Sequence, residues 1–292
     1  MKTLTVVLLA LTLTATTALA GEKIDKTLKA SADGEVEITN IAGTVEITGW
    51  DRNEVKVTGT LGKGTEGLDF ESSGGQVTIE VKYPDNARNV EDTDLQIWVP
   101  VKSSLEVGTV SASISVETVK GALELGSVSG GITVTGEPET VDAECVSGGI
   151  EIDVKTKAVQ AECVSGPIVI KGVEHEVDAS SVSGSIRISG GTLESVEVEA
   201  VSGAVTFDGG LVKNGRLNVS SFSGSVDLFL PASVSADFDI SSFSGSIENE
   251  FGDKASRTSK HGPGNTLNFS TGSGSARITA ESFSGTVRIN KK

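Results

Sequence analysis

The sequence contains little of what most active sites use. Its 292 residues include 2 His, 2 Cys, 2 Trp and 1 Tyr, and aromatic residues make up 4 %. A Ser-His-Asp or Cys-His device would need His175 or His261 beside a nucleophile. His175 lies between two glutamates in a predicted turn, and His261 precedes a Gly-Pro pair. We therefore assign no catalytic residue and no cofactor-binding residue.

Basic residues are also scarce. The chain has 24 Lys and Arg against 40 Asp and Glu, which gives a formal net charge of -16. Affinity for nucleic acid comes mostly from Lys and Arg that displace counterions from phosphates. A strongly acidic surface repels such polyanions, so nucleic acid is excluded as a partner and anionic lipid is disfavoured.

Long hydrophobic runs are confined to the first residues. Met1-Lys2, the apolar run from Val6 to Leu13 and the small residues Ala18-Leu19-Ala20 have the order of a secretory signal peptide. Residues 1–20 are therefore predicted to be a signal peptide that is cleaved before Gly21. The alternative, a transmembrane anchor, needs a longer run without threonine. We expect an exported protein, periplasmic or secreted, with no transmembrane anchor.

A short element returns along most of the chain. Residues 143–152, AECVSGGIEI, come back as residues 161–170, AECVSGPIVI. The Ser of the Val/Phe-Ser-Gly-x-Ile/Val element, with Ala for Gly in the first copy, recurs at Ser111, Ser129, Ser147, Ser165, Ser183, Ser202, Ser223, Ser244 and Ser284. The step is 18 residues at first, then 19 and 21, with a last step of 40. A nearly constant step indicates a repeat architecture whose units must stack on one another.

Each repeat shows the two-residue period of β-strands. Val141, Ala143 and Cys145 alternate with acidic residues before the Ser-Gly corner, and Ile150 and Ile152 alternate with acidic residues after it. These apolar columns are predicted to point inward. Each turn therefore holds two short strands, and glycine fits a corner that is crowded or needs a positive φ.

These observations predict an all-β fold, a single elongated parallel β-solenoid (β-helix) with about 18–21 residues per turn. The left-handed hexapeptide form needs an aliphatic residue every six, but steps of six from Ile132 reach Pro138 and Glu144. We therefore expect a right-handed coil, the usual hand of parallel crossovers. Phe replaces Val before the later corner serines, which suggests that the core widens toward the C-terminus.

The predicted organisation has three parts. Residues 1–20 are the signal peptide, and residues 21–104 form a less regular β region that caps the solenoid and is continuous with it. Residues 105–292 form the regular repeats, with an excursion at 250–265. Strand-like alternation resumes after the excursion, and the strand around Val287 closes the chain.

Several segments resemble a known family. They are Asn40 to Ile47 near Trp50, Val99-Pro100 before Ser104 to Val107, the repeated Ser-Gly strands, Leu230 to Ser233 and Phe243 to Gly252. The chain is similar in these segments to the bacterial "putative adhesin" β-strand-repeat proteins, a domain of unknown function. The resemblance covers most of residues 35–292. It implies an exported envelope protein and contributes no catalytic residues.

Two classes of function remain. The first is a non-catalytic binding, adhesion or scaffolding module of the cell envelope, with a protein, glycan or cation partner. The alternative is a carbohydrate-active β-helix enzyme, a polysaccharide lyase or hydrolase. Such enzymes usually cluster Asp, Lys or Arg on one face, whereas Asp153, Lys171 and Arg187 are scattered here. The repeated serine is structural, since it cannot be a nucleophile nine times over.

Cys145 and Cys163 occupy the same inward column in consecutive turns. Neighbouring parallel strands place their Cα atoms about 4.8 Å apart, within the range seen for disulfides. Stacked side chains nevertheless hold their Cβ atoms further apart than disulfides prefer. A disulfide and two buried thiols therefore both remain open.

Two outward columns before the corner serines contain carboxylates and no Lys or Arg. Their predicted centre consists of Asp142, Glu144, Glu162, Asp178, Glu197 and Glu199. Like charges on adjacent strands are mildly destabilising. The stripe is either a solvated acidic face or a surface that receives divalent cations such as Ca²⁺, or a basic partner, because hard cations favour clustered carboxylate oxygens.

Overall fold

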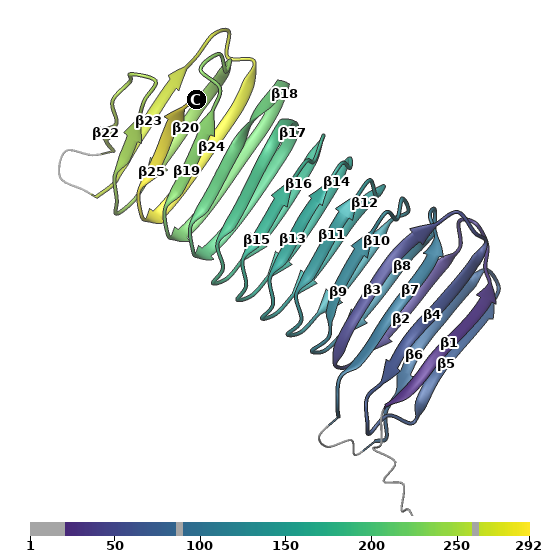
Figure 1. Ribbon diagram of the computed structural model, residues 1–292. Helices are drawn as coiled ribbons and strands as arrows, with labels where there is room; N and C mark the ends of the chain where they lie inside the picture. Colours follow the sequence, from purple (N-terminus) through teal and green to yellow (C-terminus); the bar gives the residue numbers. More distant parts are fainter. Residues whose placement is uncertain (1–20, 86–89, 259–262) are drawn as a thin grey trace, which may run out of the picture.

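The computed structural model describes residues 21–85, 90–258 and 263–292, and the elements of this part of the chain are all β-strands. None of these residues forms a helix with the length and hydropathy of a membrane span. The predicted signal peptide, residues 1–20, and His261 lie outside the described residues. Figure 1 shows a long ladder of strands that runs from β1 and β5 at one end to β22 and β23 at the other.

The strands are mostly short. They are β1 (Glu22–Lys29), β2 (Glu35–Asn40), β3 (Gly43–Trp50), β4 (Glu54–Leu61), β5 (Gly67–Ser73), β6 (Gln76–Lys82), β7 (Thr93–Pro100), β8 (Ser104–Thr109), β9 (Ser113–Glu117), β10 (Leu123–Ser127), β11 (Ile132–Gly136), β12 (Thr140–Cys145), β13 (Ile150–Val154), β14 (Ala158–Cys163), β15 (Ile168–Lys171), β16 (Glu176–Ser181), β17 (Ile186–Ser202), β18 (Val205–Ser223), β19 (Val226–Leu230), β20 (Ala236–Ser242), β21 (Ile247–Asn249), β22 (Ser256–Arg257), β23 (Asn265–Ser270), β24 (Ala276–Ser284) and β25 (Val287–Lys291).

The middle of the molecule consists of two stacks of parallel strands. Stack A contains β8, β10, β12, β14, β16 and the C-terminal parts of β17 and β18, and it continues through β24 to β20. Stack B contains β9, β11, β13, β15 and the N-terminal parts of β17 and β18, and it continues through β19 and β25 to β21. Val141 of stack A pairs with Val159, and Ile150 of stack B pairs with Ile168. Each step of the register is one predicted repeat, so the sequence period and the spatial period agree over these turns.

The all-β prediction is confirmed, but the parallel β-solenoid is not, because the one connected sheet of 25 strands is mixed. Antiparallel pairs join β1 to β4, β4 to β7 and β5 to β6 at one end. Antiparallel pairs also join β20 to β23 and β22 to β23 at the other. The antiparallel strands lie where the repeat is weakest in the sequence, and they cover edges that would otherwise expose unpaired backbone groups.

The last two strands of the chain do not lie at the end of the array. β24 lies between β18 and β20, with Leu217 and Phe238 both paired to Ile278. β25 likewise lies between β19 and β21. The C-terminal turn is therefore inserted between two turns that precede it in the chain, as the yellow strands in Figure 1 show.

The predicted inward columns form the core. Ile150 and Ile152 are fully buried, as are Ala143 and the paired valines of the same stacks. Outward neighbours such as Glu151 are exposed. The alternation of the sequence thus becomes one continuous hydrophobic core along the array, because each turn covers the apolar edge of the next.

The corners between the two strands of each turn depend on a side chain and a glycine. The buried Ser127 and Ser181 hydroxyls accept hydrogen bonds from the backbone N–H three residues on, at 2.9 and 2.8 Å. A Cβ atom on Gly148 would clash with the carbonyl oxygen of Gly130 in the preceding turn. Crowding, not a positive φ, is the reason for glycine at this corner.

Candidate functional site

The predicted acidic stripe lies on the outer surface of stack A. The register aligns Glu106, Glu124, Asp142, Asp178, Glu197 and Asp239 along one line, and Glu144, Glu162, Glu199 and Glu281 along another. We call these ten carboxylates the acidic columns. The structure brings the six predicted residues onto one face and adds four more. Within the described residues, none of the ten takes part in an ion pair.

Two aspartates of this face have raised pKa values. Burial raises the pKa of Asp142 above its ordinary value, and the nearby carboxylates of Glu144 and Glu124 raise it further. Burial also raises the pKa of Asp178, with Glu197 as the largest charged contributor. One oxygen of Asp142, Oδ1, is buried without a hydrogen-bond partner among the described residues. Ionisation of Asp142 and Asp178 therefore lowers the stability of the folded protein.

The raised pKa of Asp142 predicts how stability depends on pH. The folded state binds this proton more tightly than the unfolded state. Protonation of Asp142 therefore stabilises the fold below the ordinary pKa, and this stabilisation is lost as pH rises through the raised pKa of the folded state. We expect Asp142→Asn to raise the melting temperature by a few degrees at pH 7 and by less at pH 4. Thermal unfolding at both values tests this, with Glu151→Gln as the control. A variant less stable than wild type at pH 7 would contradict it.

The carboxylates run along lines and do not converge. In the described part of the chain, no three acidic, His or Cys side chains form a group that could hold a metal ion. Binding of Ca²⁺ to the acidic columns therefore stays a prediction, in which the ions neutralise carboxylate charge along the columns. We expect millimolar Ca²⁺ at constant ionic strength to raise the melting temperature, and Glu144→Gln with Glu162→Gln to diminish the shift. An undiminished shift in this pair would leave only general charge screening.

Cys145 and Cys163 are adjacent and buried, and both are free thiols in the structure. The two sulfurs occupy the position that the buried hydroxyls of Ser127 and Ser181 have in the neighbouring turns. Each accepts a hydrogen bond at 3.0 Å, Cys145 from Gly148 N–H and Cys163 from Gly166 N–H. Burial raises the pKa of the Cys145 thiol, and Cys163 raises it further. The Cys145 thiol is therefore held in the protonated, weakly nucleophilic form.

The corner hydrogen bonds predict the redox state of this pair. Because each sulfur already has a backbone donor in its own turn, we expect two free thiols in the purified protein. Alkylation under denaturing conditions without reductant should add two alkyl groups, as measured by intact mass. An unchanged mass that gains two groups only after reduction would establish the disulfide that the register permits.

A second line of side chains, which the sequence analysis did not identify, runs beside the acidic columns. It consists of the residue before each corner serine, in spatial order Val110, Val128, Val146, Val164, Val182, Val201, Phe222, Phe283 and Phe243. The valines are 44 to 49 % exposed and the phenylalanines 47 to 58 %. We call this line the apolar ladder. Its signal was present in the sequence, since a residue that follows an inward position must point outward.

The three phenylalanines correct the prediction of a widening core. They lie on the surface, where Phe283 stacks on Phe222 at 4.8 Å between ring centroids and on Phe243 at 4.9 Å. The interplanar angles are 2° and 11°. The exchange of Val for Phe therefore enlarges the exposed ladder at its C-terminal end, while the core receives other aromatic residues such as Phe207.

Stack B presents a different surface. Several of its outward charged side chains form ion pairs, with Lys171 3.5 Å from Glu151 and Arg288 3.1 Å from Asp227. The two faces of the same repeat thus differ in kind. One is a mixed surface with internal ion pairs, and the other combines unpaired carboxylates with exposed apolar side chains.

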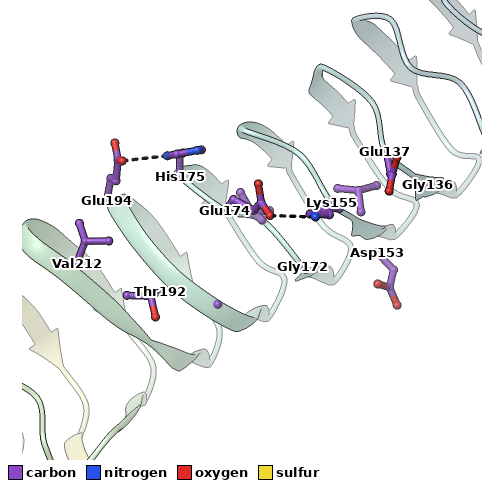
Figure 2. Close-up of a pocket in the computed structure, with 13 residues that line it drawn as sticks. Gly136, Glu137, Asp153, Lys155, Gly172, Glu174, His175, Thr192, Glu194 and Val212 are labelled. Atoms are coloured by element: carbon purple, nitrogen blue, oxygen red, sulfur yellow. Dashed lines mark hydrogen bonds and ion pairs between the residues drawn. The ribbon is translucent and has the colours of Figure 1, made fainter.

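The turns after stack B line an open groove of about 870 Å³. Figure 2 shows that its charged groups come from successive turns, with His175 beside Glu194 at 2.9 Å and Lys155 beside Glu174 at 3.6 Å. His175 lies at an exposed turn, as the sequence predicts. Its partner is a carboxylate, and no Ser or Cys hydroxyl or thiol lines the groove in the described part of the chain.

These features define an all-β strand-repeat protein with one long face that is both acidic and apolar. The model of the Toastrack DUF4097 family matches residues 34–290, and the chain belongs to this family. The resemblance to the "putative adhesin" strand-repeat proteins is thereby confirmed. No curated protein matches the chain significantly.

Three solved structures are similar over long stretches at low identity. A putative cell adhesion protein from Clostridium sporogenes ATCC 15579 is 12 % identical, over 93 % of this chain and 100 % of that one, with a TM-score of 0.31. A putative adhesin from Bacteroides fragilis NCTC 9343 is 10 % identical, over 93 % and 97 %, with a TM-score of 0.47. A putative adhesin from Parabacteroides merdae ATCC 43184 is 13 % identical, over 71 % and 96 %, with a TM-score of 0.42.

Proposed function

We propose that this chain is a non-catalytic binding or scaffolding module of the cell envelope, and that it binds through the outer face of stack A. The apolar ladder carries the proposal. Nine exposed apolar side chains follow one another in register, whereas soluble proteins rarely leave contiguous apolar surface of this extent unoccupied. The predicted signal sequence supports export to the periplasm or beyond. We further propose that the parallel turns form a right-handed β-solenoid, in which the antiparallel strands act as caps.

A scaffold of stacked turns suits this role. The side chains of the face are fixed by the backbone register, so binding loses little conformational entropy. Ring stacking in the phenylalanine trio adds to this order, because each ring restrains its neighbour. The surface is thus arranged before a partner arrives.

One experiment distinguishes the proposed binding module from the enzymatic alternative. The purified chain is mixed with a panel of polysaccharides and with insoluble envelope material, and both retention and release of reducing or unsaturated sugar ends are measured. We expect retention on envelope material without release of sugar ends. We also expect Phe222→Ser, Phe283→Ser and Phe243→Ser together to reduce retention. Release of sugar ends would instead favour a polysaccharide lyase or hydrolase.

A further inference from the structure

We propose that the apolar ladder and the acidic columns together bind a cationic amphipathic helix of a partner protein, laid lengthwise along stack A. The inference rests on the proposed binding function and adds the chemistry and shape of the partner. Four observations carry it: the charge of the face, the distance between its columns, the spacing of its rungs and the stacking of its rings.

Charge selects a basic partner. The acidic columns contain ten carboxylates, and among the described residues no ion pair neutralises them, although other carboxylates of the chain do form ion pairs. Burial, and then the neighbouring carboxylates, raise the pKa values of Asp142 and Asp178, so the ionised forms of both groups are disfavoured on this face. Lys or Arg side chains placed there relieve the repulsion, whereas a second copy of the same face would increase it.

The distance between the columns places the charges on one flank of the partner. Glu144 precedes Val146 by two residues of one extended segment, which corresponds to about 7 Å, and Asp142 lies about 13 Å from the ladder. An α-helix is about 10–12 Å in diameter with its side chains. A helix seated on the ladder therefore brings one flank of Lys or Arg residues over the nearer acidic column. A groove of about 560 Å³ lies along this line, between the valines and Glu144 and Glu162.

The spacing of the rungs favours a helix over an extended chain. Rungs of parallel strands repeat about every 4.8 Å, so the nine rungs span about 38 Å. A helix with two apolar positions per heptad presents one every ~5.3 Å along its axis. A β-strand presents one every ~6.7 Å on the same face. The helix stays in register with several consecutive rungs, whereas the strand falls out of register after two.

The stacked rings disfavour a glycan on this ladder. Both faces of Phe283 are covered, by Phe222 on one side and Phe243 on the other. A sugar ring binds best to a free aromatic face, but this ring offers mainly its edge. Ring edges and valine methyl groups suit the aliphatic side chains of a helix better.

A synthetic peptide tests the proposal on the full chain. The probe is a fluorescein-labelled helix of about 26 residues, long enough for the ladder at 1.5 Å per residue. It carries Leu at the two apolar heptad positions and Lys on one flank. The references are a scrambled peptide of the same composition and a peptide with Glu in place of Lys. Binding is measured by fluorescence anisotropy at low and physiological salt.

We expect the amphipathic cationic peptide to bind at least tenfold more tightly than either reference. Phe222→Ser, Phe283→Ser and Phe243→Ser together should weaken binding about tenfold. Glu144→Gln, Glu162→Gln and Glu199→Gln together should weaken binding and flatten its salt dependence. The matched control removes the same charge from stack B through Glu117→Gln, Glu151→Gln and Asp153→Asn, and it should leave affinity unchanged.

Several outcomes would overturn the proposal. The first two are equal binding of the scrambled peptide and equal weakening of peptide binding by the stack B control. The third is a concentration-dependent dimer that the phenylalanine variant abolishes, because that result assigns the ladder to a second copy of the chain. Circular dichroism and the melting temperature show whether each variant folds. If the peptide does not bind but envelope material is still retained, the partner chemistry is wrong while the binding module stands.

Discussion

Deletion of residues 275–292 should disorder residues 236–274. The deleted segment contains β24 and β25, which lie between β18 and β20 and between β19 and β21. In a repeat protein each turn is stabilised mainly by its two neighbours. Loss of an inner turn therefore separates residues 236–274 from the rest of the core, although these residues are still present. β19 keeps its direct pairing with β18.

Hydrogen exchange followed by mass spectrometry measures this effect directly. We expect peptides from residues 236–274 to lose most of their protection, while peptides from residues 123–181 keep theirs. The matched control replaces residues 254–264 with a short Gly-Ser linker, which removes β22 at the outer edge of the sheet and should change little. Unchanged protection of residues 236–249 after the C-terminal deletion would contradict the inserted position of the last turn.

Ile150→Asp should unfold the protein or destabilise it by more than about 4 kcal/mol, because it places an unpaired carboxylate in the core. Ile150 is 1 % exposed and lies between Ile132 and Ile168 of the adjacent turns. Glu151→Gln, one residue on and facing outward, should change stability by less than about 0.5 kcal/mol.

Chemical denaturation of the two variants gives both values. If Glu151→Gln costs as much as Ile150→Asp, the inward and outward assignment of the repeat is wrong. A small loss for both would mean that the turns do not share one core. The pair tests the alternation itself, because the two positions differ only in the side of the strand from which they project.

The middle of the fold could be predicted from residue pattern alone. Ala143 and Cys145 alternate with exposed acids, and the same residues return 18 positions later, so burial and register follow from one period. The order of the turns at the C-terminal end could not be predicted from this pattern. β18, β20 and β24 carry similar inward residues, so each fits against either of the others, and only tertiary packing decides which two become neighbours.

Of the candidate site, the acidic columns could be predicted from the sequence, but the apolar ladder was not. Glu144 and Glu162 are recognisable because acids recur at one outward position, and the structure places them where the register predicts. Val146 and Phe222 were not recognised, because an apolar residue in a repeat is first interpreted as core. Their outward direction follows from the same alternation, since each comes directly after a buried residue, and this rule extended past the end of the strand would have identified the ladder.

Covalent mapping of the bound peptide tests the role of the ladder most directly. The cationic amphipathic peptide is made with photo-leucine at its apolar positions, cross-linked to the full chain and located by mass spectrometry. We predict cross-links at ladder residues such as Val146, Val164 and Phe222, and few at Val169, the outward residue of β15 in stack B. Cross-links spread evenly over both stacks, or concentrated on stack B, would contradict the assignment of stack A as the binding face.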